Sequence, residues 1–141
     1  MDQITVETMV RAPIEFVWHS YIHPQDLEQW NRASPDWETI DAKTDFRVGG
    51  EFSHRMQAKD GSMGFDFAGV YTEINPHHLI EYRFGDRHAK VEFIDQDHAV
   101  TVRVSFEPET VYSEEQQQLG WQAILDNFSR YTEQKYVTDV L

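Results

Sequence analysis

The chain has 141 residues, and its 12 Lys and Arg against 25 Asp and Glu give a formal net charge of -13. Hydrophobic residues make up 40% of the sequence and aromatic residues 13%, which is enough to build one buried core and excludes a disordered chain. We therefore expect one domain that covers residues 1–141. Nucleic acid and anionic membranes are bound mainly through Lys and Arg, so the charge predicts neither as a partner.

The sequence contains no cysteine, which excludes disulfides, thiol nucleophiles and cysteine-ligated zinc sites. The first residues carry neither a basic start nor an apolar run, and this predicts no secretory signal. No apolar stretch approaches the ~20 residues that a membrane-spanning helix needs. Together these features predict a soluble protein of the cytoplasm.

The first part of the chain predicts one strand followed by two short helices. Apolar side chains alternate over residues 4–10, as in a strand with one buried face. Pro13 suits the first turn of a helix, and apolar residues recur at helical spacing from there to Tyr21. A second helix is expected to start at His23–Asp26, with Trp30 on its apolar side.

Residues 37–106 carry strand signals throughout. Turn sequences such as Gly49-Gly50 and Asn75-Pro76 separate short segments in which apolar and polar residues alternate. Connections this short favour a bent antiparallel sheet of about six or seven strands in sequential order. The alternation changes face near Gly69, where we expect a β-bulge.

The last part of the chain predicts a long amphipathic helix over about residues 114–136. Ser113 and Gln116 have the spacing of a capping box, and an apolar stripe follows from Leu119 to Tyr131. A bent antiparallel sheet needs its concave face covered, so this helix is expected to pack there. The predicted fold class is α+β, a helix-grip fold in which a space between sheet and helix would hold a ligand.

Several segments resemble a known family. The helix entry Ala12–Trp18 is similar to that of the START/Bet v 1-like (SRPBCC) superfamily. The hairpin Asp45–Phe52 is similar to that of its branch named after the activator of the heat-shock-protein-90 ATPase. Further segments that resemble this branch are Gly69–Ile74, Gly120–Phe128, Trp30–Ser34 and Ala58–Phe67. The last two resemble a bacterial single-domain subgroup, and the resemblance runs from about residue 4 to 134.

The resemblance implies the helix-grip fold but no single activity, because the superfamily spans lipid carriers, hormone receptors, polyketide cyclases and proteins of unassigned role. In eukaryotic activators of this branch, the similar domain follows an N-terminal domain that does much of the chaperone stimulation. A chain of 141 residues has no room for that domain, so co-chaperone activity is not expected to carry over. A chaperone-interaction module that uses the acidic surface is a further alternative, which the sequence does not support.

The predicted inner faces collect aromatic side chains and one histidine. His54 shares a face with Phe52 and Met56, where a neutral imidazole could bind a polar group of a ligand or act as a base. No nucleophile or second catalytic group stands near it, so we expect no catalytic residue. The predicted ligand-binding residues are Trp30, Phe52, His54, Phe67, Tyr82, Trp121 and Phe128.

Two alternatives stay open for these residues. Asp66 could be a carboxylate near the cavity, although its parity places it outside, where it would pair with Arg55. The alternative function is therefore a polyketide cyclase-like or hydrolase-like enzyme that uses His54 or Asp66 as the base. Trp37, like the other tryptophans, could belong to a ligand box or to plain core.

The histidines do not predict a metal site. His19 and His23 have the spacing of helical ligands, but Pro24 makes His23 a helix cap, and we see no carboxylate cluster beside them. His77 and His78 are adjacent in a turn, where two rings can hardly converge on one ion. We expect no metal and no cofactor. The function that we expect is binding of a small apolar or aromatic molecule without turnover.

Overall fold

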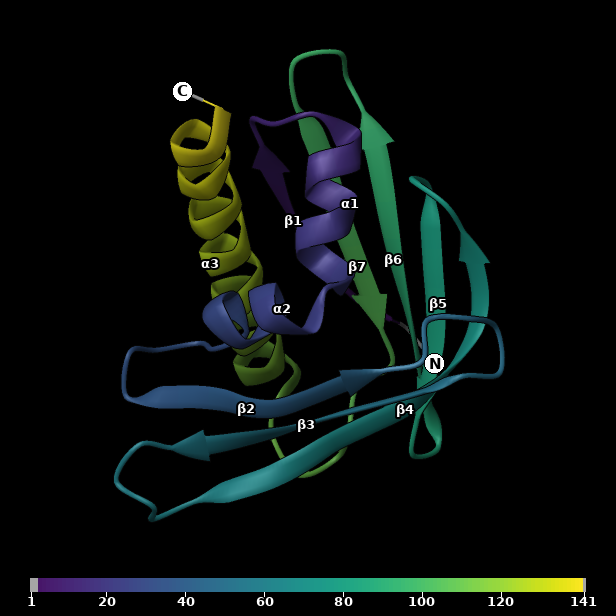
Figure 1. Cartoon of the computed structure of the whole chain (residues 1–141). Helices are drawn as coiled ribbons and strands as arrows, with labels where there is room; N and C mark the ends of the chain where they lie inside the picture. The colour runs from purple at the N-terminus through teal and green to yellow at the C-terminus, as the bar shows by residue number, and fades with distance from the viewer. Residues whose placement is uncertain (1–2, 141) are drawn as a thin grey trace.

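The computed structural model describes residues 3–140, which form one seven-stranded sheet and three helices (Figure 1). The strands are β1 (Ile4–Val10), β2 (Trp37–Thr44), β3 (Glu51–Ala58), β4 (Gly64–Asn75), β5 (Leu79–Phe84), β6 (Arg87–Asp95) and β7 (Val100–Phe106). The helices are α1 (Ile14–Ile22), α2 (Pro24–Trp30) and α3 (Glu114–Val140). All neighbouring strands are antiparallel, in the order β1-β7-β6-β5-β4-β3-β2. The order of elements expected from the sequence is confirmed.

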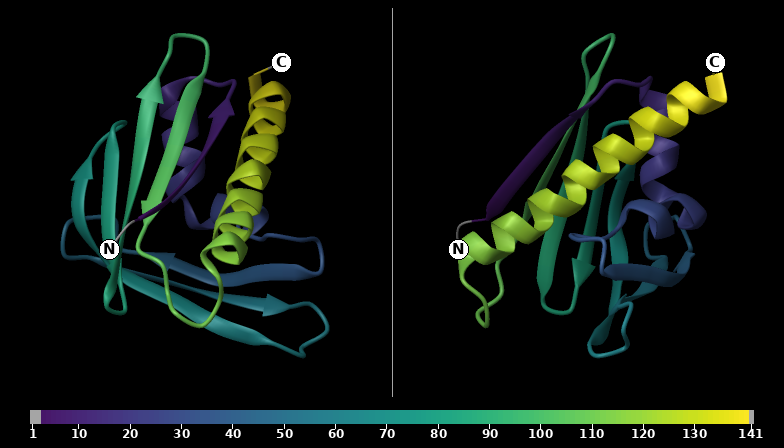
Figure 2. Two further views of the ribbon diagram at one scale, coloured as in Figure 1. Left: turned by 180° about the vertical axis from the view of Figure 1, so that it is seen from behind. Right: turned by 90° about the vertical axis from the view of Figure 1, so that its left-hand side faces the viewer.

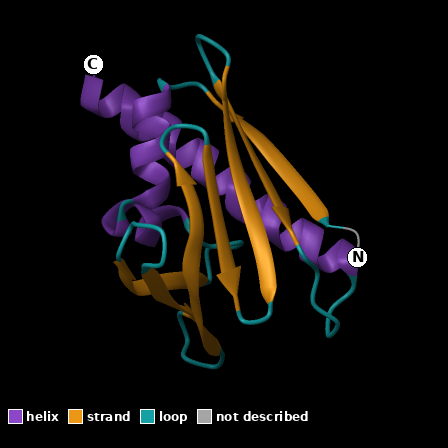
Figure 3. Ribbon diagram, turned by 90° about the vertical axis from the view of Figure 1, so that its right-hand side faces the viewer, coloured by secondary structure: helices purple, strands orange, loops and turns teal. Residues whose placement is uncertain are grey.

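The sheet is strongly bent. In Figure 1, strands β2 and β3 run across the view, whereas β5, β6 and β7 run upward. Strand β4 carries the bend, because its first half pairs with β3 and its second half with β5. Figure 2 shows α3 passing diagonally along the opening of the bend, with α1 and α2 beside it. All three helices lie on the same side of the sheet (Figure 3). The expected α+β helix-grip architecture is therefore confirmed.

The junction of α1 and α2 is a single residue. His23 has extended backbone angles (φ -74°, ψ 125°), and its N–H donates to the carbonyl of His19, at the end of α1. Its own carbonyl accepts the first helical bond of α2, from Leu27 N–H. Pro24 follows at the first position of α2, where the missing N–H is harmless. His23 is thus a helix cap, as the sequence predicts.

Helix α3 begins with the predicted capping box. Gln116 N–H donates to Ser113 Oγ at 3.1 Å, and Ser113 N–H donates to Gln116 Oε1 at 3.2 Å. The helix extends to Val140, beyond the predicted end near residue 136, and Lys135 Nζ lies 3.6 Å from Asp139 Oδ2 one turn further along it. Within residues 3–140, no helix combines the length and the apolar character needed to span a membrane.

The inward face of α3 differs from the predicted stripe at its start. Leu119 is 65% exposed, and the buried residue of the first turns is Gln117. Two residues on a helix are separated by about 200°, so Leu119 must face away from the sheet when Gln117 faces it. The expectation that the stripe begins at Leu119 is therefore wrong, whereas Leu125 and Phe128 are buried as predicted.

Helix α3 also covers the free edge of β1. Gln122 Nε2 donates to the carbonyl of Glu7 at 2.9 Å, and Ser129 Oγ donates to the carbonyl of Met9 at 2.7 Å. Just beyond β1, Arg11 N–H donates to the carboxylate of Glu133. An edge strand exposes unpaired backbone groups, and these side chains of α3 pair several of them.

The bulge in β4 lies at Thr72 and not at Gly69. The register with β5 shifts there, so that Tyr71 and Ile74 both face the core side of the sheet. Gly69 pairs regularly with Phe52 of β3. The expected bulge at Gly69 is therefore wrong. The glycine is needed because the Phe52 ring lies across it, and a Cβ there would be only 2.6 Å from Phe52 Cζ.

Candidate functional site

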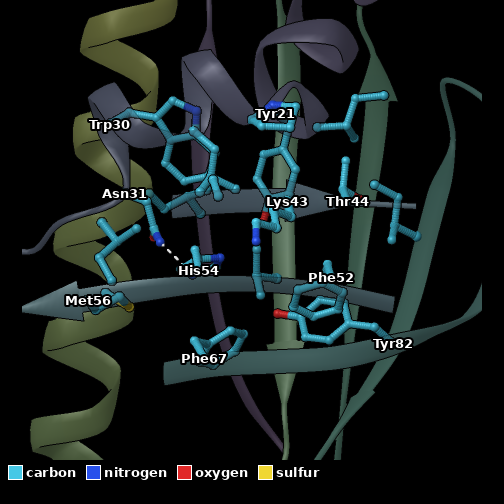
Figure 4. A pocket seen from close by; sticks show the side chains of 18 of the residues that line it. Tyr21, Trp30, Asn31, Lys43, Thr44, Phe52, His54, Met56, Phe67 and Tyr82 are labelled. Carbon is cyan, nitrogen blue, oxygen red and sulfur yellow. Dashed lines mark hydrogen bonds between the residues drawn. The ribbon is translucent and has the colours of Figure 1, made fainter. Parts of the chain in front are cut away.

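A pocket of about 230 Å³ lies between the bent part of the sheet, α2 and α3 (Figure 4). Its wall comes from residues far apart in the sequence, carried by α1, α2, β2, β3, β4, β5, β7 and α3. Aromatic and aliphatic side chains predominate, as is usual for sites that bind small molecules. Of the residues predicted for such a site, the structure places six in the wall, namely Trp30, Phe52, His54, Phe67, Tyr82 and Trp121.

Phe128 does not line the pocket. It is completely buried, with its ring centroid 4.8 Å from that of Trp30 and 5.2 Å from that of Tyr21. It lies one turn beyond Leu125 on α3, where the helix faces α1 and α2 rather than the pocket. The expectation that Phe128 lines the space is corrected: it supports the wall from behind. Trp37 is also outside the wall, with its ring centroid 6.3 Å from that of Phe65.

His54 is the most buried polar side chain of the wall, with 8% of the residue exposed. Asn31 Nδ2 donates to His54 Nε2 at 2.9 Å, and the imidazole stacks on the Phe67 ring. Burial lowers the pKa of His54 to about 4, so the ring is neutral at pH 7. Because Nε2 accepts, the proton of the neutral ring is on Nδ1. This nitrogen points away from Asn31 into the pocket (Figure 4).

The end of α2 is held in place by hydrogen bonds to three other elements. Trp30 Nε1 donates to the carbonyl of Ser20 at 2.9 Å, and Asn127 Nδ2 of α3 donates to the carbonyl of Trp30 at 2.8 Å. Thr39 Oγ1 of β2 donates to the carbonyl of Asn31 at 2.5 Å. These bonds fix the Asn31 amide that orients His54. Asn31 was not predicted as a site residue, and its place directly after Trp30 was the only sequence signal for it.

Three tyrosines bring hydroxyl groups to the pocket. Burial raises the pKa of Tyr21, Tyr71 and Tyr82, so all three are neutral phenols at physiological pH. The Tyr71 hydroxyl lies 2.7 Å from Thr44 Oγ1. Tyr21 and Tyr71 were not predicted. Tyr71 shares the parity of Phe67 along β4, which is the signal that could have identified it.

Asp66 lies on the opposite face of the sheet from His54. It is exposed, and its Oδ1 is 3.4 Å from Arg55 Nη1 on the neighbouring strand, as its parity predicts. Among the described residues that line the pocket, none is an aspartate or a glutamate. His54 and Asp66 therefore cannot act together on one substrate.

Asp26 lies beside the two histidines of the α1–α2 junction, a grouping that was not predicted. Its Oδ2 lies 3.8 Å from His19 Nε2 and 3.6 Å from His23 Nδ1. The spacing of His19 and His23 is visible in the sequence, but the place of Asp26 beside them is not, because the extended backbone of His23 turns α2 back toward α1. His77 lies elsewhere, with its ring against that of Trp18.

A bent antiparallel sheet, a long C-terminal helix beside its concave face and an apolar pocket between them define a helix-grip protein of the START/Bet v 1-like kind. The chain belongs to the family described as "Activator of Hsp90 ATPase homolog 1-like protein", which it matches over residues 11–133. This confirms the family resemblance seen in the sequence. None of the curated proteins matches the chain.

Solved structures agree with this assignment. An AHSA1-like protein from Aeromonas hydrophila is 40% identical, with a TM-score of 0.88 over 94% of this chain and 93% of that one. A protein from Cytophaga hutchinsonii is 44% identical, with a TM-score of 0.81 over the same shares of the two chains. Protein CV1439 from Chromobacterium violaceum is 24% identical, with a TM-score of 0.84 over 94% of this chain and 99% of that one, and shows the fold alone. These likenesses establish family and fold, and bring no ligand or reaction with them.

Proposed function

We propose that the protein binds a small apolar or aromatic molecule in this pocket and does not turn it over. The observation that carries the proposal is the composition of the wall: aromatic rings surround a space of about 230 Å³, into which one neutral imidazole N–H points. Such a wall favours flat or fatty molecules through burial, and a few polar groups set their orientation.

The volume limits the size of the ligand. A dry protein cavity of ~150 Å³ holds one benzene molecule, so the pocket has room for roughly ten heavy atoms. At about 0.5 kcal/mol per heavy atom, burial of such a ligand gives roughly 5 kcal/mol, or a Kd of a few hundred micromolar. A hydrogen bond from His54 Nδ1 to an acceptor on the ligand would account for about 1 kcal/mol of this total.

The environment of His54 supports binding over catalysis. A general base works best when its pKa lies near the working pH, whereas burial lowers that of His54 to about 4. Its other nitrogen is engaged by Asn31, and Asp66 lies on the far face of the sheet. These features argue against the cyclase-like or hydrolase-like alternative.

We do not expect the protein to bind nucleic acids or anionic membranes. A formal net charge of -13 supports this, because both are bound chiefly through basic side chains. The cytoplasmic location stays a prediction.

The first test is a search for the ligand. Native mass spectrometry of freshly purified protein would show a co-purified small molecule, and a thermal-shift screen of flat aromatic and fatty compounds would find substitutes for it. Quinoline, with ten heavy atoms and one acceptor nitrogen, is a suitable soluble reference. We expect it to raise Tm and to bind with a Kd near a few hundred micromolar.

Two variants make the test specific. His54→Ala should weaken quinoline binding about fivefold by removing one hydrogen-bond donor, and Asp66→Ala, on the outer face, should leave it unchanged. Removal of a general base typically lowers a rate by about 10²–10⁴-fold. Conversion of any bound compound at a rate that falls this much in His54→Ala would contradict the proposal that the protein does not turn its ligand over. The absence of any hit at millimolar concentration would contradict the proposal as a whole.

A further inference from the structure

A second group of polar side chains lies at the α1–α2 junction, away from the pocket wall. The nearest ring nitrogens of His19 and His23 are 3.8 Å and 3.6 Å from Asp26 Oδ2. The three ligand atoms all lie within 4.8 Å of one another, and residues 3–140 hold no other such group of His, Asp or Glu side chains. Ligands bound at about 2.1 Å to a tetrahedral ion are roughly 3.4 Å apart, so the spacing is close to that of a metal site.

The carboxylate of Asp26 is already oriented for such a site. The residue is 5% exposed, and its Oδ1 accepts the Tyr131 hydroxyl at 2.5 Å and lies 3.4 Å from Lys135 Nζ. Both partners come from α3. They engage one oxygen and leave Oδ2 facing the two imidazoles. Outer partners of this kind fix the ligands of many protein metal sites.

His23 Nδ1 is a buried polar atom without a hydrogen bond to any described residue. Buried ring nitrogens are usually paired, and one left alone weakens the fold. Its position 3.6 Å from Asp26 Oδ2 is too long for a hydrogen bond but leaves space for an ion between them.

One local change is required for an ion to enter. The His19 and His23 rings are stacked, with centroids 4.8 Å apart and planes 22° from parallel, so their in-plane lone pairs do not meet. The His19 side chain is 58% exposed. Its ring can therefore turn about its last torsion to bring Nε2 toward the shared point, with little packing to disturb.

We propose that His19 Nε2, His23 Nδ1 and Asp26 Oδ2 bind one divalent transition-metal ion, Zn²⁺ in the first place, with solvent as the fourth ligand. Two imidazoles and one carboxylate suit Zn²⁺ and disfavour Mg²⁺ and Ca²⁺, which prefer oxygen ligands. The ion joins α1 to α2 and, through Tyr131 and Lys135, to α3. Its binding therefore stabilises the folded state.

The test uses the whole protein, freed of metal with EDTA and titrated with ZnCl₂ by isothermal calorimetry. We expect one Zn²⁺ per chain, and at ~100 times the Kd a rise in Tm on the order of 10 °C. MgCl₂ should have no effect. Binding should weaken as the pH falls from 7.5 to 5.5, because protons compete for the two imidazoles.

Variants identify the ligands. His19→Gln and His23→Gln should each reduce Zn²⁺ affinity by more than about a hundredfold, since even the loss of an outer partner typically costs 10–100-fold. The matched control is His98→Gln, the same substitution at an exposed histidine between β6 and β7, and it should bind as the parent does. Circular dichroism checks that all three variants are folded.

Either of two results would overturn the proposal. One is a metal-free parent protein that takes up no stoichiometric Zn²⁺ at pH 7.5. The other is stoichiometric binding that persists with unchanged affinity in both His19→Gln and His23→Gln, since the ion would then lie elsewhere.

Discussion

His54 is a buried polar side chain with one ring nitrogen paired and the other available to a ligand. A buried imidazole is disfavoured in its charged form, and here no carboxylate of the pocket wall offsets that cost. Asn31 instead satisfies one nitrogen of the neutral ring. The second nitrogen is therefore a hydrogen-bond donor whose protonation does not change near pH 7, and it suits recognition of a neutral acceptor.

The same residue should couple stability to pH. The pKa of His54 is about 4 in the folded state and about 6.5 in the unfolded chain. Between these values the unfolded state binds more protons, so the free energy of unfolding rises with pH. The contribution is complete above about pH 6.5 and is lost as the pH falls toward 4. Between pH 7.5 and 4.5 the parent should lose about 2 kcal/mol more than His54→Gln in urea unfolding. Equal losses would show that His54 is not buried in its neutral form.

Gly69 is a residue whose side chain is excluded by its neighbours. A Cβ at this position would lie 2.5 Å from the Arg83 carbonyl oxygen and 2.6 Å from Phe52 Cζ. Because one of these atoms belongs to the backbone of β5, the strain cannot be relieved by a side-chain rotation alone. Gly69→Ala should therefore lower the free energy of unfolding by about 1–3 kcal/mol, measured by denaturant titration. Coincident midpoints for the variant and the parent would contradict this packing.

At the scale of elements, the sequence correctly predicted the features that depend on interactions between residues close together in the chain. The capping box of Ser113 and Gln116 correctly set the start of α3, because its bonds join residues three apart. The alternation along β4 correctly indicated a bulge but not its position. A break in alternation shows that one residue is extra, whereas pairing with β5 determines that this residue is Thr72.

The candidate site also contains residues that the local sequence pattern predicted and residues that it did not. Strand parity placed Phe52, His54 and Phe67 on the inner face of the sheet, and the structure places all three in the pocket wall. Phe128 could not be separated from Trp121 by pattern, because one apolar stripe of α3 serves both the pocket and the core behind it. Contacts between distant segments, such as that of Asn31 with His54, left no local signal.

Helix α3 offers a second glycine as a contrast to Gly69. Gly120 lies inside the helix, and a Cβ there would meet no atom within 4 Å. Alanine restricts the unfolded chain more than glycine does and is the better helix former. Gly120→Ala should therefore raise the free energy of unfolding by about 0.5–1 kcal/mol in the same denaturant assay. A loss of stability would mean that α3 tolerates no side chain at this position.

Across the whole molecule, the sheet has a packed half and a hollow half. Completely buried side chains concentrate in β1, β6 and β7, where Val10, Val91, Val100, Val102 and Phe106 are fully enclosed. Strands β2, β3 and β4 contribute few buried apolar residues and instead form much of the pocket wall. We infer that the packed half provides most of the stability, which leaves the other half free to keep a space open.

The central claim is that the space between the sheet and α3 holds the ligand, and filling that space tests it most directly. Ile124 is half-buried on α3 and lines the pocket, whereas Leu119 is exposed on the same helix. Ile124→Trp adds a large ring to the pocket, and Leu119→Trp is its matched control on the surface. Cooperative unfolding of both variants would establish that each is folded.

Quinoline titrated into the three proteins by calorimetry or NMR gives the decisive comparison. We predict that the parent and Leu119→Trp bind it with a Kd of a few hundred micromolar, and that Ile124→Trp binds at least about tenfold more weakly because the ring occupies the ligand's place. Equal binding by Ile124→Trp and Leu119→Trp would contradict the account, since the ligand would then lie outside the pocket.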